Sequence, residues 1–93
     1  MIYQILPYTK RQAQKLGVLI RPSFRKGKKI DVLNKKLQVI VSIGAKGYLD
    51  YPHYLKYFGK EIAEQKRKLY KKRHQKDRKK KGSAGWYADK LLW

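Results

Sequence analysis

The sequence has no cysteine and few acidic residues, and both shortages exclude classes of protein. Without cysteine there are no disulfides, no thiolate zinc sites and no cysteine nucleophiles. Six Asp and Glu residues are scattered among 25 Lys and Arg residues, with no spacing that indicates a metal site. No apolar run approaches the roughly 18 residues that a membrane span needs. The apolar stretch over Met1–Pro7 lacks the features of a signal peptide, so we expect a protein that is not secreted.

Recognisable catalytic motifs are also missing. His53 and His74 are the only histidines, and they lie in unrelated segments. There is no P-loop, no dinucleotide fingerprint and no HExxH pattern. We therefore expect a protein that is not an enzyme, with no catalytic residues, no metal, no cofactor and no small-molecule substrate.

What the sequence has in excess is positive charge, with a formal net charge of +19 over 93 residues. Such an imbalance destabilises a compact chain through self-repulsion, and it indicates an anionic partner rather than a particular fold. Nucleic acid, an anionic membrane surface and acidic protein surfaces are the candidates. Hydrophobic residues make up 42% of the chain, too many for a disordered tail, so we also expect a small core.

The first half of the chain predicts a short helix followed by a β-hairpin. An extended lead-in over 1–8 precedes Thr9, which has the position of a helix N-cap, and Gly17 has the position of a C-terminal cap. Residues 18–20 are β-prone, and a hairpin is expected over 29–43. The hairpin turns at Asn34-Lys35-Lys36 and places Leu37, Val39, Val41 and Ile43 on one face at a period of two.

The second half of the chain predicts mainly helices. Asp50 caps a Tyr-rich helix over 52–58, and a helical pattern then runs from Lys60 to about Lys81. We expect an α+β fold in a single domain. Its parts are a core over 1–59 made of the short helix, the hairpin and the Tyr-rich helix, a long basic helix over 60–82, and an aromatic tail with a short helix over 83–93.

The strongest functional signal is the basic segment 66–81, in which eleven of sixteen residues are Lys or Arg. On a helix these cations surround the axis and repel one another, a cost that a bound polyanion removes. We expect contacts to a phosphate backbone, which position a nucleic acid without reading its bases. A solvated basic tail is the alternative. The predicted contacts are Lys66, Arg67, Lys71, Lys72, Arg73, Lys76, Arg78, Lys79, Lys80 and Lys81.

A second basic element is the loop 21–29, in which cations surround Phe24. Its functional interpretation is a flexible phosphate clamp whose aromatic ring stacks on a base. The alternative is an ordinary loop with Phe24 in the core. The predicted contacts are Arg21, Arg25, Lys26, Lys28 and Lys29.

Aromatic residues gather in two further places. Tyr48, Tyr51, Tyr54, Tyr57 and Phe58 favour core packing, with a base-stacking platform as the alternative. The second group is predicted either to pack back on the hairpin or to form a protein-interaction surface. It consists of Trp86, Tyr87, Leu91, Leu92 and Trp93.

Three segments have distinctive sequence motifs: IGAKGYLDYPHY over Ile43–Tyr54, YKKRHQKDR over Tyr70–Arg78, and the closing GWYADKLLW. From Tyr8 to Trp93 the chain resembles a family of short basic proteins of unassigned function that large DNA viruses and some phages encode. It departs from that family at the turn 34–37, where Asn-Lys-Lys-Leu replaces a more usual Asn-Gly type of turn. The resemblance implies a viral origin and no particular activity.

Charge and resemblance together favour a non-enzymatic basic viral protein that binds nucleic acid, DNA rather than RNA. Binding is expected mainly through phosphates and without strong sequence specificity. The alternative is a virion structural component, such as a minor capsid or core protein, that uses the basic helix and the aromatic tail to bind other virion proteins. Either function places the protein in the virion or in the host cytoplasm or nucleus. A membrane-surface role is less favoured, because segment 66–81 lacks the apolar face of an interfacial helix.

Overall fold

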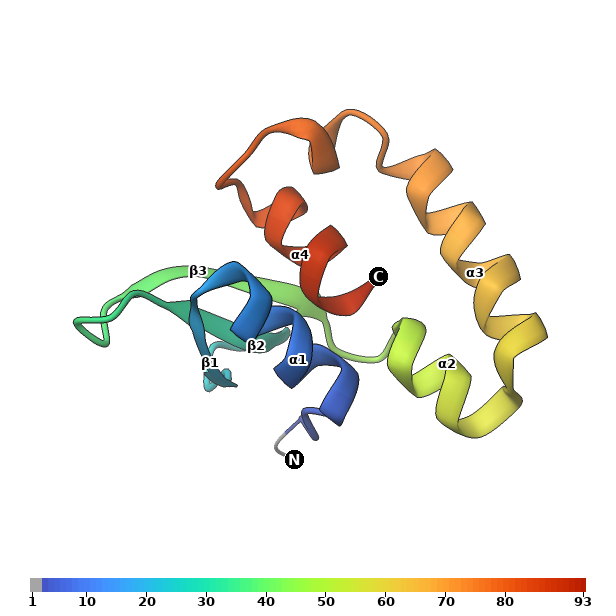
Figure 1. The fold of residues 1–93 in the computed structure, drawn as a ribbon, viewed down its shortest axis with the longest axis horizontal. Coiled ribbons are helices and arrows are strands. Elements are labelled where there is room, and N and C mark those ends of the chain that lie inside the picture. Colours follow the sequence, from blue (N-terminus) through green and yellow to red (C-terminus); the bar gives the residue numbers. More distant parts are fainter. Residues whose placement is uncertain (1–2) are drawn as a thin grey trace.

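The computed structural model describes residues 3–93 and has the α+β fold that the sequence predicts. These residues form one three-stranded antiparallel sheet of order β1-β2-β3, together with helices that exceed the strands in length (Figure 1). The expected lead-in over 1–8 includes Met1 and Ile2, which lie outside the described residues. The elements are α1 (Pro7–Leu16), β1 (Leu19–Pro22), β2 (Lys28–Leu33), β3 (Val39–Ala45), α2 (Tyr51–Phe58), α3 (Lys60–Arg73), the 3₁₀ turn η1 (Asp77–Lys79) and α4 (Ala84–Leu92).

Helix α1 begins at Pro7, with Leu6 rather than Thr9 as its N-cap. Proline is favoured in a first helical turn, because the N–H that it lacks would have no partner there. Thr9 is instead fully buried, and its hydroxyl makes no hydrogen bond to any residue of 3–93, so the predicted side-chain cap is wrong. At the other end Gly17 adopts a φ of 71° and its N–H reaches the Gln14 carbonyl, which confirms the predicted C-terminal cap.

The predicted hairpin is the β2–β3 pair, and β1 adds a third strand on the other side of β2. Its turn is closed by the Asn34 side-chain oxygen, which accepts hydrogen bonds from the N–H groups of Lys36 and Gln38. The Asn34 side chain thus stabilises the reversal of the chain, which an Asn-Gly turn stabilises through its backbone conformation.

The expected inward-facing row on the hairpin is only half correct. Val41 is half-buried and Ile43 is buried, but Leu37 is 68% exposed at a φ of 64° in the turn. Val39 is also exposed, beside an irregularity in the β2–β3 pairing at Val32/Leu33. An irregularity of this kind breaks the alternation of faces, so the period of two holds only for the part of β3 nearer to α2.

One face of the sheet is covered by α1 and α4, and this contact forms the core. Burying a large apolar side chain contributes roughly 1.5–3 kcal/mol, so α4, which supplies two of them, is a main source of stability. The buried residues of this cluster are Ala13 from α1, Ile30, Val32 and Ile43 from the sheet, and Leu91 and Leu92 from α4.

Helix α2 is capped as predicted, because the Asp50 carboxylate accepts a hydrogen bond from the His53 N–H at 3.2 Å. It ends at Gly59, and α3 follows at once. The two helices pack against each other on one side of the sheet and carry the chain away from it (Figure 1).

The basic helix is shorter than the sequence predicts. Helix α3 ends at Arg73, so a continuous helix to Lys81 is wrong, and the chain then doubles back through η1 toward α4 (Figure 1). At the helix end the Arg78 guanidinium Nε donates to the Lys71 carbonyl at 3.2 Å. That bond satisfies a carbonyl that the end of a helix leaves without a partner.

Gly85 lets η1 lie directly against the first turn of α4. A Cβ at this position would lie 2.7 Å from the carbonyl oxygen of Asp77, which is too close for any other residue. Ser83 begins α4 by accepting a hydrogen bond from the Trp86 N–H, while its own hydroxyl donates to the Lys80 carbonyl at 2.7 Å. The return of the chain after α3 is therefore fixed by specific contacts.

Candidate nucleic-acid interface

A groove of about 840 Å³ lies between the end of β3, helix α3 and helix α4. Its lining combines cations with aromatic rings, the two groups that nucleic acids engage through phosphates and bases. We call it the basic groove, and define it by the cations Lys28, Lys66, Arg73, Lys76 and Lys80 and the rings of Tyr48, Tyr54, Tyr70, His74 and Trp93.

Within the described part of the chain, the protein neutralises only one cation that lines the basic groove, Lys29, which is paired with Asp50 and is not among the five that define the groove. Among residues 3–93, ion pairs with carboxylates involve only four of the Lys and Arg side chains, namely Arg21, Lys29, Arg67 and Lys71. None of these four is a defining cation of the groove. Asp77 also lines it, but its carboxylate lies 3.4 Å from the His74 ring nitrogen. The groove therefore has a strongly positive lining.

The segment 66–81 divides into free and engaged cations. Seven of the predicted contacts are exposed: Lys66, Lys72, Arg73, Lys76, Lys79, Lys80 and Lys81. The other three, Arg67, Lys71 and Arg78, are partly buried and make internal contacts.

The engaged cations hold α3 in place. The Arg67 guanidinium lies 3.6 Å from the centre of the Tyr51 ring and donates to the Tyr8 hydroxyl. Lys71 forms an ion pair of 2.7 Å with the buried Asp89 of α4. These side chains link α3 to α1, α2 and α4, so their first role is structural.

Three rings of the groove are in successive stacked contact. The ring centres of Trp93 and Tyr70 are 4.3 Å apart with an angle of 7° between the planes, and those of Tyr70 and His74 are 4.4 Å apart at 26°. Burial raises the pKa of Tyr70 to about 12, with the nearby charges of Asp89 and Asp77 acting in the same direction. The phenol is therefore neutral at physiological pH and adds no negative charge to the groove.

The loop 21–29 has exposed, groove-lining and buried residues. Phe24 is 80% exposed, so its placement in the core is wrong, and Arg25 and Lys26 beside it are exposed as well. Lys28 lines the basic groove. The Gly27 carbonyl accepts from the Lys46 N–H, which joins this loop to the turn that carries Tyr48.

Two cations of that loop are engaged elsewhere. Arg21 pairs with Asp31 at 3.1 Å, and Asp31 also accepts a hydrogen bond from Ser42. Burial raises the pKa of Asp31, but hydrogen bonds from Ser23, Ser42 and Arg21 outweigh it, so the pKa lies below its usual range. Lys29 is buried, and its prediction as a phosphate contact is wrong in this structure.

The C-terminal aromatic segment packs back on the sheet. Leu91 and Leu92 are core residues, so their predicted part in a protein-interaction surface is wrong. Trp86 and Tyr87 are half-buried and meet edge to face, with ring centres 5.0 Å apart. Trp93 is half-buried in the basic groove.

The tyrosine cluster divides between the core and the basic groove. Tyr51 is buried beneath Arg67, as core packing requires. Tyr48 is largely exposed at the groove, and Tyr54 lies in it with its ring centre 6.2 Å from that of Trp93.

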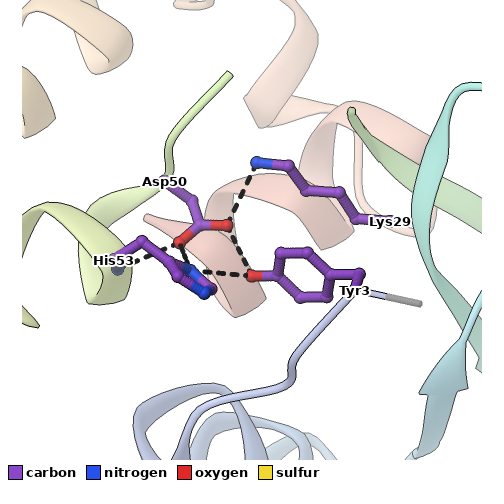
Figure 2. Close-up of polar contacts among 4 residues, drawn as sticks. All are labelled: Tyr3, Lys29, Asp50 and His53. Atoms are coloured by element: carbon purple, nitrogen blue, oxygen red, sulfur yellow. Dashed lines mark hydrogen bonds and ion pairs between the residues drawn. The ribbon is translucent and has the colours of Figure 1, made fainter. Parts of the chain in front are cut away.

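The polar cluster around Asp50 is not predicted from the sequence. Figure 2 shows its carboxylate approached from three directions by Tyr3, Lys29 and His53. The Tyr3 hydroxyl donates at 2.5 Å, the Lys29 ammonium lies at 3.1 Å, and the His53 ring nitrogen Nδ1 lies at 2.7 Å. Asp50 lies 47 residues from Tyr3 and 21 residues from Lys29 along the chain. The sequence gives no signal of these contacts, because only the fold brings the three side chains together.

The cluster shifts the pKa values of Asp50 and Tyr3 in opposite directions. Burial raises the pKa of Asp50, but the charge of Lys29 and the hydrogen bonds from Tyr3 and His53 outweigh it, so the pKa lies below its usual range. Burial, together with the charge and hydrogen bond of Asp50, raises the pKa of Tyr3. The carboxylate is thus anionic and the phenol neutral, an arrangement that clamps the segment before α1 to β2 and α2.

Comparisons with known proteins found no match to the chain among protein-family models, curated proteins or solved structures. No cluster of three or more His, Asp or Glu side chains that could hold a metal ion occurs within residues 3–93. In the same part of the chain, no helix has the length and apolar character to cross a membrane.

Proposed function

We propose that the protein binds nucleic acid without catalysing a reaction, mainly through phosphate contacts made by the basic groove and its rim. The observation that carries this proposal is the set of unneutralised cations gathered around one concave surface. A solvated basic tail needs no such concavity and no fixed turn after α3. Binding of this kind is insensitive to base sequence, because the phosphate backbone is the same for every sequence.

Salt dependence is the most direct test. Affinity for a labelled duplex of random sequence should fall steeply as salt rises, because each neutralised phosphate releases bound counterions. Fluorescence anisotropy at several salt concentrations gives the slope of log affinity against log salt. Single strands of DNA and RNA measured alongside test the expected preference for DNA.

The groove itself is tested with two double variants that remove equal charge. Lys76→Gln with Lys80→Gln removes two groove cations, and the slope for duplex DNA should fall by about 1.8, or 0.9 for each contact. Lys35→Gln with Lys36→Gln removes two exposed cations from the hairpin turn, and the slope should stay unchanged. Equal losses in the two variants, or binding that ignores salt, would show that the groove is not the interface.

A virion structural component is the second candidate function. Its supporting observation is the apolar surface that α2 and α3 expose, which includes Leu55, Tyr57, Phe58 and Ile62. Exposed apolar groups of this kind are typical of protein contacts. Mass spectrometry of purified virus particles, with and without nuclease treatment, tests the viral origin and the packaging together. Absence of the protein from intact particles would rule this function out.

A further inference from the structure

The rings inside the basic groove point to a narrower class of ligand than nucleic acid in general. We propose that the groove binds single-stranded nucleic acid, with an unpaired base stacked on the face of Trp93 that is turned away from Tyr70. This inference rests on the proposed function, and it adds which form of nucleic acid the site selects.

The geometry of the rings supports stacking of a further ring. Trp93 and Tyr70 are nearly parallel, and Tyr70 is in turn stacked with His74 at 26°. Tyr54 meets Trp93 at 46°, which gives the groove an aromatic wall beside the stacked rings. Every base has a π-face that can join such a platform, whatever its identity.

A duplex cannot use this platform. The faces of its bases are hidden against their neighbours, and only the edges and the phosphates are accessible from outside. An unpaired base can turn its face toward the rings while its phosphates remain at the surface. The groove suits that arrangement, because Lys66, Arg73 and Lys76 line the same concavity as the rings.

The size and charge of the groove agree with this ligand. Its volume of about 840 Å³ is in the range of sites that enclose small ligands, roughly 300–1,000 Å³. Tyr70 is neutral, and the carboxylate of Asp77 faces His74. Asp77 is thus the only acidic side chain in the described lining, against the five defining cations of the groove.

The two tryptophans of the chain allow a direct test, because only one of them lines the groove. Trp86→Phe leaves Trp93 as the sole tryptophan, and Trp93→Phe leaves Trp86. Titration with a short oligo-dT should quench the emission of Trp93 and leave that of Trp86 unchanged. Oligo-U in a parallel titration distinguishes DNA from RNA as the source of the single strand.

A second variant separates stacking from charge. Trp93→Leu keeps an apolar side chain and every cation, and its thermal unfolding and circular dichroism show whether the fold is retained. Loss of one base stack should weaken single-strand affinity about 5- to 150-fold. Affinity for a duplex should change less than two-fold.

The outcomes separate the two proposals. Unchanged Trp93 emission at saturating oligo-dT, or equal weakening of single strand and duplex in Trp93→Leu, overturns the stacking inference and leaves the proposed function standing. If neither form of nucleic acid binds in a salt-dependent way, the proposed function fails first and the inference falls with it.

Discussion

Replacing Asp50 by asparagine tests whether the buried cluster of Figure 2 stabilises the fold through charge. Asp50 is 1% exposed and Lys29 is 5% exposed, so the ion pair between them is shielded from water. Asparagine has nearly the same shape and is equally favoured as a helix N-cap, so the cap of α2 on the His53 N–H is retained. What the substitution removes is the negative charge beside the Lys29 ammonium.

The expected cost is large for a domain of this size. Removing one partner of a buried ion pair typically destabilises by about 3–5 kcal/mol, because the other charge stays buried without compensation. A chain of 93 residues has a total free energy of unfolding of roughly 5–14 kcal/mol. Asp50→Asn should therefore lose about a fifth or more of the stability of the protein.

Removing both charges should restore much of that loss. In Asp50→Asn with Lys29→Met, the methionine fills the space of the lysine stem and no charge remains buried. A matched control is Glu64→Gln, which neutralises the partly exposed pair of Glu64 with Arg67 and should cost less than about 1 kcal/mol. Denaturant unfolding followed by circular dichroism gives all three values.

The pH dependence of the same variant follows from the pKa of Asp50. Because that pKa is lowered on folding, the contribution of the carboxylate is fully present above its unfolded pKa of about 3.9 and is lost as the pH falls further. The difference in unfolding free energy between the wild type and Asp50→Asn should thus be constant near neutrality and shrink below about pH 4. A cost under about 1 kcal/mol at pH 7, or no recovery in the double variant, would refute the reasoning.

Two further predictions concern the contact of η1 with α4 and the buried ring of Tyr70. Gly85→Ala should destabilise the protein by about 1–3 kcal/mol, because the added Cβ would force η1 away from α4 at the Asp77 carbonyl. The control Ala84→Ser, at the exposed neighbouring position, should change stability little. Chemical denaturation of both variants checks this prediction. The pKa of Tyr70 is raised to about 12, so the contribution of the neutral phenol to stability is intact below about pH 10 and is lost as the pH rises toward 12. Tyr70→Phe should therefore lose less stability between about pH 10 and 12 than the wild type. Equal losses in alkaline unfolding measurements would contradict this prediction.

Local signals in the sequence predict the elements of this fold well. Asp50 followed by Pro52 marks the start of α2, and Gly17 marks the end of α1, because caps and turns depend on neighbouring residues alone. Asn34 marks the hairpin turn for the same reason. The start of α1 is missed because Pro7 and Thr9 both carry start signals, and only the packing of Thr9 in the core decides between them.

The end of the basic helix at Arg73 cannot be predicted from local signals in the sequence. Lys and Arg are good helix formers, and no residue between Arg73 and Lys81 is a strong helix breaker. The helix ends because Arg78 turns back onto the Lys71 carbonyl and Gly85 admits η1 against α4. Both contacts join residues whose proximity depends on the fold.

The candidate site is predictable in charge and not in shape. The exposed cations of segment 66–81 follow directly from composition. Their gathering with Tyr70 and Trp93 around a groove depends on α4 returning to the sheet, which the pattern of its apolar residues leaves open. Lys29 is predicted as an exposed phosphate contact but is buried, because nothing in a basic loop indicates that this lysine pairs with the buried Asp50.

The position of α4 in the core has a consequence for the biosynthesis of the protein. The Gln12 side chain of α1 donates to the Lys90 carbonyl of α4, so the two helices that cover the sheet come from distant parts of the chain. A ribosome-bound chain that lacks α4 leaves Ile30, Val32 and Ile43 without their contacts to Leu91 and Leu92. Contacts of such long sequence separation form late in folding. Trp93, which directly follows α4, lines the basic groove. A nascent chain therefore completes its core and its groove together, once α4 and Trp93 have been synthesised.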